Sequence, residues 1–578
     1  MYLKRCGPSK SKNEQLYWEL VESYRTERGP RQRVVAYLGD ISQSECRGVK
    51  QAAVAEKTSY WQSRLFDEEG EPEWVEVDTK RIRVGRVKDF GGYWLGLQML
   101  DKLELISFLE KTIHHGREDI EWSIMSLALV LWRLCEPSSE LSIAEHLYER
   151  SPLADLLGIE EVKINDGRLY RALDNLLPHK NALEKHLKER LGELFNLEYD
   201  LLLYDVTSTY VEGEAKDNGQ AQRGYSRDHR PDCKQICIAL VVSREGLPLG
   251  YEIFNGNRHD VTTVKEIVTK IESQYGRAQR IWVMDRGMLS EDNLAFLQSK
   301  KRRYIIGTPK SQLKHFEQEL LSKDWEKLRD DLEIKACPAP SGDETFILCR
   351  SEARAQKEKE KAIHERFEKR IEQGLAKIAE SCRQRQQKVG RIERRVGRLL
   401  GANTRAAGLF KVEVKDGKAG QVEIVWHKEE AWRHWAELSE GYYMLRTNIT
   451  DWRAGELWEA YIQLTQAETA FRIQKSDLKI RPIWHQKEAR VKAHILVCFL
   501  AYVLWKMLGQ LCQRAGLGNE PRKIFDEIAQ IKVVDVVLPT KLGTTITKRC
   551  ISQPTKAQSV LLQKLNLHLP QYMKYYNL

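Results

Sequence analysis

Three acidic side chains at widely separated positions could together hold a metal ion. Asp205 directly follows the apolar run 201–204, and Asp285 directly follows the apolar run 281–284. Continuous apolar runs of this length are typical of strands that are buried on both faces. If the two strands are neighbours, both aspartates lie within reach of one site, and a helix packed on the sheet can supply Glu468. Carboxylate oxygens are the ligands that Mg²⁺ prefers in proteins, so the pattern predicts a magnesium site.

The segment 461–482 predicts the helix that carries Glu468. It contains no Gly, its only Pro is the last residue, and it is rich in residues that favour helices. Spacings of three and four would bring five side chains to one side of this helix: Tyr461, Leu464, Glu468, Phe471 and Lys475. An ordinary amphipathic helix would place mostly aliphatic side chains there. An unpaired carboxylate on a half-buried face is costly, so Glu468 needs a metal ion or a basic partner.

Each of these acids also has an ordinary structural interpretation. Glu468 can pair with Arg472 one helical turn later, which would leave Lys475 in solvent. Asp205 and Asp285 can be turn or cap residues, which is the commoner use of aspartate. The joint occurrence of two aspartates after buried runs and a glutamate on a mixed helix face favours the metal site.

The three motifs resemble those of the DDE transposases of bacterial insertion sequences. The segments YDVTSTY, WVMDRGM and AETAFRIQKSDLKIRP carry the resemblance, which covers roughly residues 195–510. Within that family the similarity is to the group with the signature Tyr-x2-Arg-x3-Glu-x6-Lys, insertion-sequence family four and its relatives. Tyr461, Glu468 and Lys475 fit this signature, whereas Leu464 stands at its Arg position. Arg472 is the candidate to replace that arginine in contacting phosphate.

The resemblance implies a transposase that cuts and pastes DNA with two divalent metal ions, Mg²⁺ or in its place Mn²⁺. Asp205, Asp285 and Glu468 would be its catalytic residues and metal ligands, with Asp205 bridging the ions. Two ions can stabilise both the attacking and the leaving oxygen of a phosphodiester displacement. Water would first cut one strand at the element's end, and the freed 3′-OH would then attack the other strand or the target. Tyr461 and Lys475 would hold a terminal phosphate, a role that suits the point charge of lysine.

The expected partners are double-stranded DNA, as element ends and as target, and a second copy of the chain in a homodimer on that DNA. We expect the protein to act in the prokaryotic cytoplasm, associated with the nucleoid when bound to DNA. No Walker-type loop is present, so we expect no nucleotide cofactor. Two other functions stay open: a metal-dependent nuclease of the same fold that does not join strands, and a domesticated protein that binds DNA without catalysis.

The expected fold class is α/β, with a ribonuclease-H-like mixed sheet interrupted by an inserted domain of strands and long helices. Strand runs followed by helical segments favour such a sheet, and the resemblance implies the same fold. We expect six regions: an N-terminal β-rich region and linker (1–85), a helical region that binds DNA ends (86–197), the first part of the catalytic core (198–310), the insertion domain with a charged helical hairpin (311–440), the second part of the core (441–515) and a C-terminal region (516–578).

Two regions ahead of the insertion offer basic side chains for DNA contacts. Asn165 or Asp166 can cap a helix that would present Arg168 and Arg171 to a major groove, as in a helix-turn-helix. A helical bundle without DNA contact is the alternative. The polar loop 212–232 carries Arg223, Arg227, His229 and Arg230 and could follow a DNA backbone.

The insertion region predicts a pair of antiparallel helices, because apolar residues recur there every three to four positions over 363–399. The basic end of this pair carries four arginines: Arg391, Arg394, Arg395 and Arg398. These could clamp DNA or a second subunit, and a solvated arm is the alternative. By resemblance, a tryptophan of the region would stabilise a flipped base near a hairpin end, although a core position is the ordinary use of tryptophan. The candidates are Trp426, Trp432 and Trp435.

Composition limits the remaining classes of protein. The 578 residues include 93 Lys/Arg and 83 Asp/Glu, a net charge of +10 that is compatible with nucleic-acid binding. Residues 351–400 hold 15 basic and 8 acidic residues, so most of the excess lies in the insertion region. The 11 cysteines without paired CxxC spacing predict reduced thiols. The start lacks an apolar core and the apolar run 494–508 is shorter than a bilayer span, so we expect neither a signal peptide nor a membrane anchor.

Overall fold

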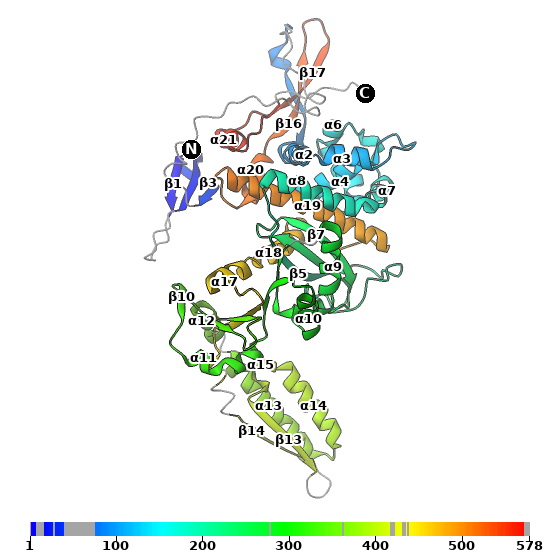
Figure 1. Cartoon of the computed structure of the whole chain (residues 1–578). Helices are drawn as coiled ribbons and strands as arrows, with labels where there is room; N and C mark the ends of the chain where they lie inside the picture. Colours follow the sequence, from blue (N-terminus) through cyan, green and yellow to red (C-terminus); the bar gives the residue numbers. More distant parts are fainter. Residues whose placement is uncertain are drawn as a thin grey trace. The chain divides into compact units, whose positions relative to one another are not determined.

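Two compact units make up the chain. The computed structural model describes residues 2–6, 17–26, 29–39, 75–276, 279–360, 363–416, 422–429, 435 and 438–570. The first unit comprises Met1–Ala278 and Thr465–Leu578, and the second comprises Gln279–Leu464 (Figure 1). Tyr461 and Glu468 therefore belong to different units, although they are close in sequence.

One long apolar helix, α19 (Glu488–Arg514), forms the centre of the first unit. It packs against other helices of this unit, among them α2 (Gly91–Lys102), α4 (Trp122–Cys135), α7 (Asp166–Leu176), α8 (Lys180–Phe195), α18 (Thr465–Ser476) and α20 (Pro521–Ile528). Within the described parts of the chain, α19 alone has the length and composition of a membrane span, but 78% of its apolar stretch is buried inside the protein. Its apolar surface is thus satisfied by other helices. At the start of α7, Asn165 Oδ1 accepts a hydrogen bond from the Arg168 backbone N at 2.8 Å, which confirms one of the two predicted caps.

Three antiparallel strands of the first unit carry the first candidate aspartate: β5 (Leu201–Val211), β6 (Lys234–Ser243) and β7 (Pro248–Asn255). The prediction that Asp205 ends its strand is wrong, since β5 continues for six further residues. Thr207, Ser208 and Thr209 are buried there and pair with β6. β-Branched threonines suit a strand of this kind, so the hydroxyl-rich stretch extends the strand instead of turning the chain.

Six strands of the second unit belong to a mixed sheet, in which they follow the order β10-β11-β12-β15-β9-β8. Its strands are β8 (Ile281–Met284), β9 (Arg303–Gly307), β10 (Glu326–Arg329), β11 (Leu332–Pro338), β12 (Thr345–Ser351) and β15 (Tyr442–Thr447). β8 and β9 are parallel, with helix α10 (Glu291–Ser299) between them in the chain, and the other pairs are antiparallel. The chain is therefore of mixed α/β class, as predicted.

The predicted single helix over 461–482 is in fact two shorter helices. Helix α17 (Ala454–Ile462) ends where the Leu464 backbone N donates to Tyr461 O at 3.0 Å, a tight i to i−3 bond. Helix α18 (Thr465–Ser476) follows at once. Leu464 is buried at the break. Tyr461 therefore does not share a helix face with Glu468, whereas Lys475 does.

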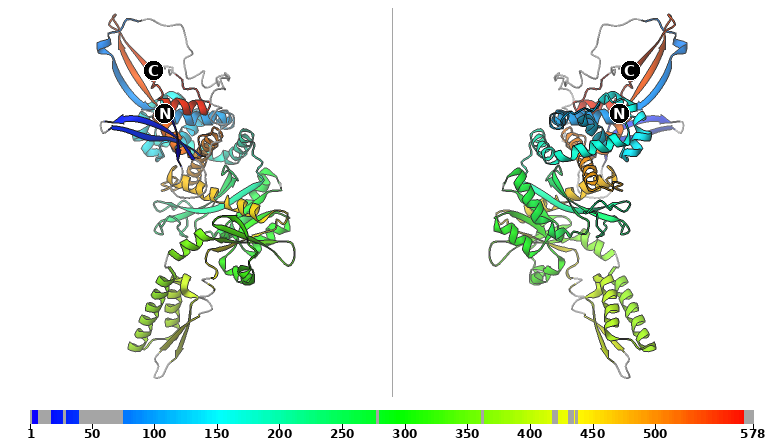
Figure 2. Two further views of the ribbon diagram at one scale, coloured as in Figure 1. Left: turned by 90° about the vertical axis from the view of Figure 1, so that its left-hand side faces the viewer. Right: turned by 90° about the vertical axis from the view of Figure 1, so that its right-hand side faces the viewer.

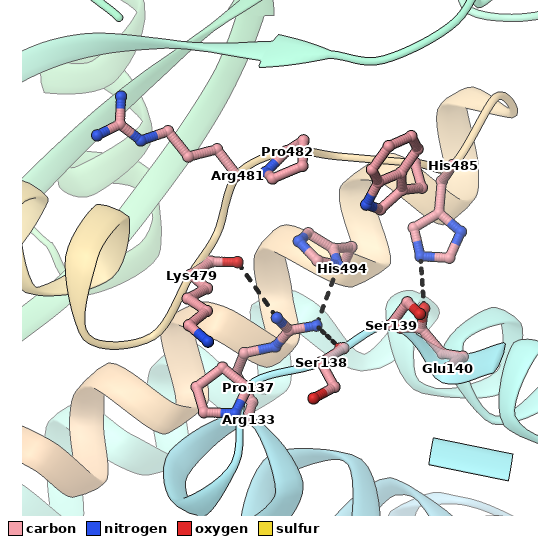
Figure 3. A pocket seen from close by; sticks show the side chains of 11 residues that line it. Arg133, Pro137, Ser138, Ser139, Glu140, Lys479, Arg481, Pro482, His485 and His494 are labelled. Carbon is pink, nitrogen blue, oxygen red and sulfur yellow. Dashed lines mark hydrogen bonds and ion pairs between the residues drawn. The ribbon is translucent and has the colours of Figure 1, made fainter. Parts of the chain in front are cut away.

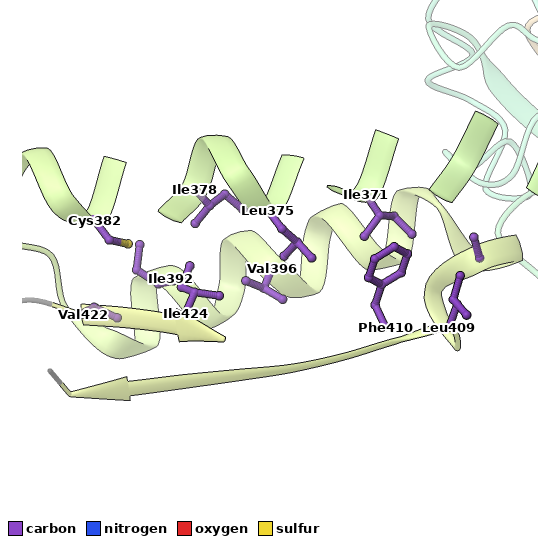
Figure 4. Packing of buried hydrophobic residues seen from close by; sticks show 11 residues of the cluster. Ile371, Leu375, Ile378, Cys382, Ile392, Val396, Leu409, Phe410, Val422 and Ile424 are labelled. Atoms are coloured by element: carbon purple, nitrogen blue, oxygen red, sulfur yellow. The ribbon is translucent and has the colours of Figure 1, made fainter. Parts of the chain in front are cut away.

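The helical pair of the insertion region packs against a β-hairpin. Helices α13 (Ile363–Gln384) and α14 (Val389–Ala402) form one layer, and β13 (Phe410–Asp416) and β14 (Val422–Lys428) cover it. Ile371, Leu375, Ile392, Val396 and Ile424 are all buried between these elements (Figure 4). The apolar spacing thus predicted the buried side of both helices, and the pair is a small packed core instead of a solvated arm.

Two small sheets complete the first unit. Near the N-terminus, β1 (Tyr2–Cys6), β2 (Tyr17–Thr26) and β3 (Gly29–Gly39) form an antiparallel sheet. Strand β4 (Arg83–Asp89) pairs with β16 (Lys532–Pro539), which pairs with β17 (Thr545–Ile551) (Figure 2). Residues that precede the helical region and residues from the end of the chain therefore share one sheet.

Candidate catalytic site

Asp205 lies in the middle of β5, with its side chain half-buried. Its Oδ1 accepts a hydrogen bond from the Val206 backbone N at 2.8 Å. The residue pairs with Leu240 across the β5–β6 ladder. Alternation along a strand places it on the same face of the sheet as Leu203 and Thr207. The backbone of β5 thus fixes one oxygen of the carboxylate.

Glu468 lies on α18, and α18 packs against β5. The buried side of α18 is formed by residues that flank the glutamate, among them Ala467, Ala470 and Phe471. Glu468 itself is exposed, which differs from the half-buried position that the sequence predicted. The structure therefore places Asp205 and Glu468 on two elements that are in contact, and both carboxylates have access to solvent.

Lys475 is held by a buried carboxylate, Asp228, that the sequence motifs do not indicate. Its Nζ donates to Ser208 O at 2.7 Å and to Asp228 Oδ1 at 3.0 Å. Asp228 also pairs with Arg481, and its side chain is 3% exposed. Burial lowers the pKa of Lys475 below its ordinary value, while the Asp228 charge acts in the opposite sense. The ammonium thus bridges α18, β5 and the loop after β5.

The arginines of the loop 212–232 are largely engaged within the protein. Arg227 pairs with Asp260, and Arg230 pairs with both Glu212 and Asp232. Arg223 donates to a carbonyl of the same loop at 3.2 Å. These ion pairs balance most of the positive charge of the loop. The loop is therefore less suited to follow a DNA backbone than the sequence predicts.

Asp285 and Tyr461 belong together in the second unit. Asp285 follows β8 directly, as predicted, and precedes a single turn of 3₁₀ helix (Arg286–Met288). Burial raises the pKa of Tyr461, and the Asp285 charge raises it further. A Cβ atom added at Gly307 would lie 2.5 Å from the Tyr461 hydroxyl and 3.2 Å from the Arg286 backbone N. The Tyr461 hydroxyl therefore lies beside the turn that Asp285 begins, and the approach of Asp285 to the other two acids stays a prediction.

The three predicted DNA-binding arginines differ in their surroundings. Arg472 is exposed on α18, one turn after Glu468. Arg171 is exposed on α7, with its guanidinium carbon 5.5 Å from the ring centre of Trp122. Arg168 pairs with Asp119 at 2.8 Å, and its side chain is 16% exposed. A DNA contact by Arg168 would therefore require it to give up this ion pair, whereas the other two present their charge outward.

A second group of metal-ligand type lies in the first unit, at positions that no sequence motif indicates. The ligand atoms of Glu140, His485 and His494 all lie within 4.8 Å of one another, and all three residues are buried. They line a pocket of about 150 Å³ together with Arg133 and Trp484 (Figure 3). His485 Nε2 lies 3.3 Å from Glu140 Oε2. The three residues come from distant segments, so no sequence spacing connects them.

Hydrogen bonds within this cluster leave little room for a cation. His494 Nε2 donates to Ile480 O at 3.0 Å, so its Nδ1 carries the lone pair. Arg133 Nη2 lies 3.5 Å from that Nδ1 and also donates to Ser138 O (Figure 3). Burial and the Arg133 charge lower the pKa of His494 to about 3. A permanent guanidinium charge beside the free lone pair opposes an ion there, so the cluster serves to join α4, α19 and the segment before α19.

Two family models match the sequence. The model described as "Transposase DDE domain" matches residues 196–504, which is more than half of the chain. The chain belongs to the DDE transposase family. The model described as "IS1634 family transposase, N-terminal domain" matches residues 7–63, so this DDE transposase is of the insertion-sequence kind. Asp205, Asp285 and Glu468 all lie within the matched DDE domain.

One similar solved structure is described as "Cryo-EM structure of piggyBac transposase synaptic complex with hairpin DNA". The present chain and the piggyBac chain are 9% identical in sequence, with a TM-score of 0.34. The alignment covers 79% of the present chain and 82% of the piggyBac chain. No curated protein matches the sequence. The family assignment rests on the match to the DDE domain.

Proposed function

We propose that this transposase cleaves DNA at the ends of an insertion sequence and transfers the resulting 3′-OH ends into target DNA. Asp205, Asp285 and Glu468 are its catalytic carboxylates. The observation that carries this proposal is the packing of α18 on β5, which brings the Glu468 helix against the Asp205 strand across a long stretch of sequence. Two carboxylates on adjoining elements, both with access to solvent, are what a metal-dependent nuclease or transposase needs.

The donor set of the proposed site fits hard divalent cations. Carboxylate oxygens suit Mg²⁺ and Mn²⁺, and the exposure of Glu468 allows an ion to meet DNA phosphate as well. When bound, two such ions would stabilise charge on the attacking and leaving oxygens. The cluster of Glu140, His485 and His494 is a poorer match, since imidazole nitrogens suit Zn²⁺ and related metals instead.

Lys475 and Tyr461 are proposed to hold the phosphate at the DNA end. Lys475 follows Glu468 by two helical turns, so both side chains lie on one side of α18. Arg481 also pairs with Asp228. Lys475 can therefore exchange Asp228 for a DNA phosphate without leaving that buried carboxylate unpaired. Arg472, exposed on the same helix, is proposed to take the place of the signature arginine at Leu464.

Further parts of the proposal come from the resemblance. They are a ribonuclease-H-like arrangement of the core, membership of the Tyr-Arg-Glu-Lys signature group, a homodimer on DNA, and action on cellular DNA in the cytoplasm. The six regions expected along the chain are proposed as its functional division, with DNA-end binding by the helical region through Arg171 and, at the cost of its ion pair, Arg168.

A plasmid assay with paired element ends tests the proposal. With Mg²⁺, the protein should give both cleaved and joined products, and Asp205→Ala should reduce cleavage by more than about 100-fold, because even changes behind metal ligands cost 10–100-fold. End binding should persist in this variant. Asp217→Ala, an exposed acid in the following loop, is the matched control and should retain activity.

The same assay separates the two alternative functions. Nicked or linear DNA without any joined product would assign a nuclease. An unchanged DNA-dependent activity in the Asp205→Ala variant would assign a non-catalytic DNA-binding protein and overturn the proposal.

A further inference from the structure

The charge of the chain is concentrated on one short stretch of the second unit. Residues 383–398 contain seven Lys/Arg and one Glu, a surplus of +6 in a chain whose net charge is +10. Most of this stretch forms α14 and the turn before it. Such a concentration far from the proposed catalytic residues in sequence needs its own explanation.

The basic side chains divide between two sides of α14. Arg395 turns inward, where its Nη1 donates to Ser381 Oγ at 2.9 Å. Arg391, Arg394 and Arg398 are exposed on the side opposite the buried Ile392. Among the residues that the structure describes, no carboxylate pairs with any of these three. The Nε atoms of Arg394 and Arg398 donate to the carbonyls four residues earlier, which lays their stems along the helix and turns the outer nitrogens to solvent.

Glycines occupy the same exposed side. Gly397 and Gly401 have open space where a Cβ would be, within the described structure. Both lie inside or near the end of α14, where glycine weakens a helix relative to alanine. The spacing of 391, 394, 397, 398 and 401 places these residues on one face at 100° per residue. The two glycines therefore leave one edge of this face without side chains, and the three arginines place positive charge along the other edge.

Within the described structure, no carboxylate offsets the charge of these three arginines. Like charges at spacings of three and four repel each other, and the glycines add a further cost to the helix. A local conflict without internal compensation is expected at functional sites. An external polyanion resolves both costs: it neutralises the arginines, and the absent side chains let its backbone come close to the helix.

We propose that the exposed face of α14, with Arg391, Arg394 and Arg398 beside Gly397 and Gly401, docks on the sugar–phosphate backbone of duplex DNA. The three arginines span about 10 Å along the helix at 1.5 Å per residue, which corresponds to about three base pairs at 3.4 Å each. Backbone contacts of this kind carry no sequence information, so the face binds duplexes of any sequence. The inference rests on the proposed function only in taking DNA as the substrate.

Salt dependence of DNA binding tests this surface directly. The full-length protein is titrated against a labelled duplex of random sequence, without divalent metal, at several NaCl concentrations. The variant R391Q/R394Q/R398Q should show a slope of log K against log salt that is shallower by about 2.7, since each phosphate contact contributes about 0.9. The matched control is K369Q/R370Q/K377Q, which removes three exposed charges from α13 in the same small core and should retain the wild-type slope.

A glycine variant tests the close approach independently of charge. A Cβ added at Gly397 meets no neighbour within 4 Å, and leucine favours a helix over glycine, so the thermal midpoint of Gly397→Leu should equal or exceed that of the wild type. Its DNA affinity should nevertheless fall. Wild-type affinity in this variant would overturn the proposed close approach.

Three further results of these measurements would decide whether the exposed face of α14 binds DNA. An unchanged slope in the arginine variant, or equal losses in both charge variants, would overturn the proposal. A lower sedimenting mass of the arginine variant without DNA would show that the face joins two copies of the chain instead. A wild-type protein that binds with the expected slope but never joins DNA ends would refute the proposed function and leave this surface intact.

Discussion

At the residue scale, Asp228 is the acid on which the end of α18 depends. Its buried carboxylate receives both Lys475 and Arg481. Breaking a buried ion pair by removing one partner costs about 3–5 kcal/mol, because the other charge stays buried and unpaired. The two cations would also repel each other once the carboxylate is gone.

We therefore expect Asp228→Ala to lower the free energy of unfolding by about 3 kcal/mol. Chemical denaturation, followed by circular dichroism, measures this. Asp217 in the same loop is exposed. Asp217→Ala should therefore change the free energy of unfolding by no more than about 0.5 kcal/mol. Equal effects of the two variants would show that Asp228 has no special role.

Lys506 on α19 predicts a pH effect on stability. Burial lowers its pKa from an ordinary 10.5 to about 8, with Glu245 acting in the opposite sense. Its Nζ donates to Gln466 Oε1 at 3.3 Å. Between pH 8 and 10.5 the unfolded chain therefore binds more protons at this residue than the folded chain, so its contribution to stability rises with pH across that window. Below pH 8 the folded protein carries the full cost of the buried charge.

Lys506→Met should remove this cost. We expect the variant to be more stable than the wild type by up to about 3 kcal/mol at pH 7, from about 1.36 kcal/mol per pKa unit. The difference should shrink as the pH rises from 8 and should vanish near pH 10.5. Denaturation curves of both proteins across this range measure it, and a difference independent of pH would contradict the assigned cause.

At the element scale, two helical glycines have opposite predicted effects. Gly397→Ala on α14 adds a methyl group to open space and should stabilise the helix by about 0.5–1 kcal/mol. Gly91→Ala at the start of α2 would place a Cβ 1.9 Å from Ile528 O on α20. We expect that variant to lose about 1–3 kcal/mol, as overpacked cores do. Thermal midpoints of the two variants, compared with the wild type, check the sign of each effect.

The same scale shows how far the sequence predicts the structure. Local patterns suffice where residues close in sequence determine the structure. Examples are the strand that begins at Ile281, the apolar stripe of α13 and the Asn165 cap. They fail at Leu464, because helix propensities contain no information about a break between two helices at a buried residue. They also fail at Asp228, whose partner Lys475 lies 247 residues away, and at the cluster around His494. Long-range ion pairs have no periodicity from which to predict them.

At the scale of the whole molecule, binding of an ion by the proposed metal ligands should change the stability of the folded chain. An ion that binds only the folded protein stabilises it by about 2.7 kcal/mol at 100 times its dissociation constant. Mn²⁺ should therefore raise the thermal midpoint of the wild type, and EDTA should reverse the rise. Asp205→Ala should show no rise, and a rise equal to that of the wild type would place the ion elsewhere.

The burial of α19 has a consequence for the nascent chain. Helices α2, α4, α7 and α8, which enclose it, have all left the ribosome some three hundred residues before α19 is complete. At roughly 5–20 residues per second, their apolar inner sides wait on the order of 15–60 s for the helix that covers them. Biosynthesis of this transposase thus includes a long aggregation-prone interval, and we expect its yield in cells to depend on chaperones and on translation speed.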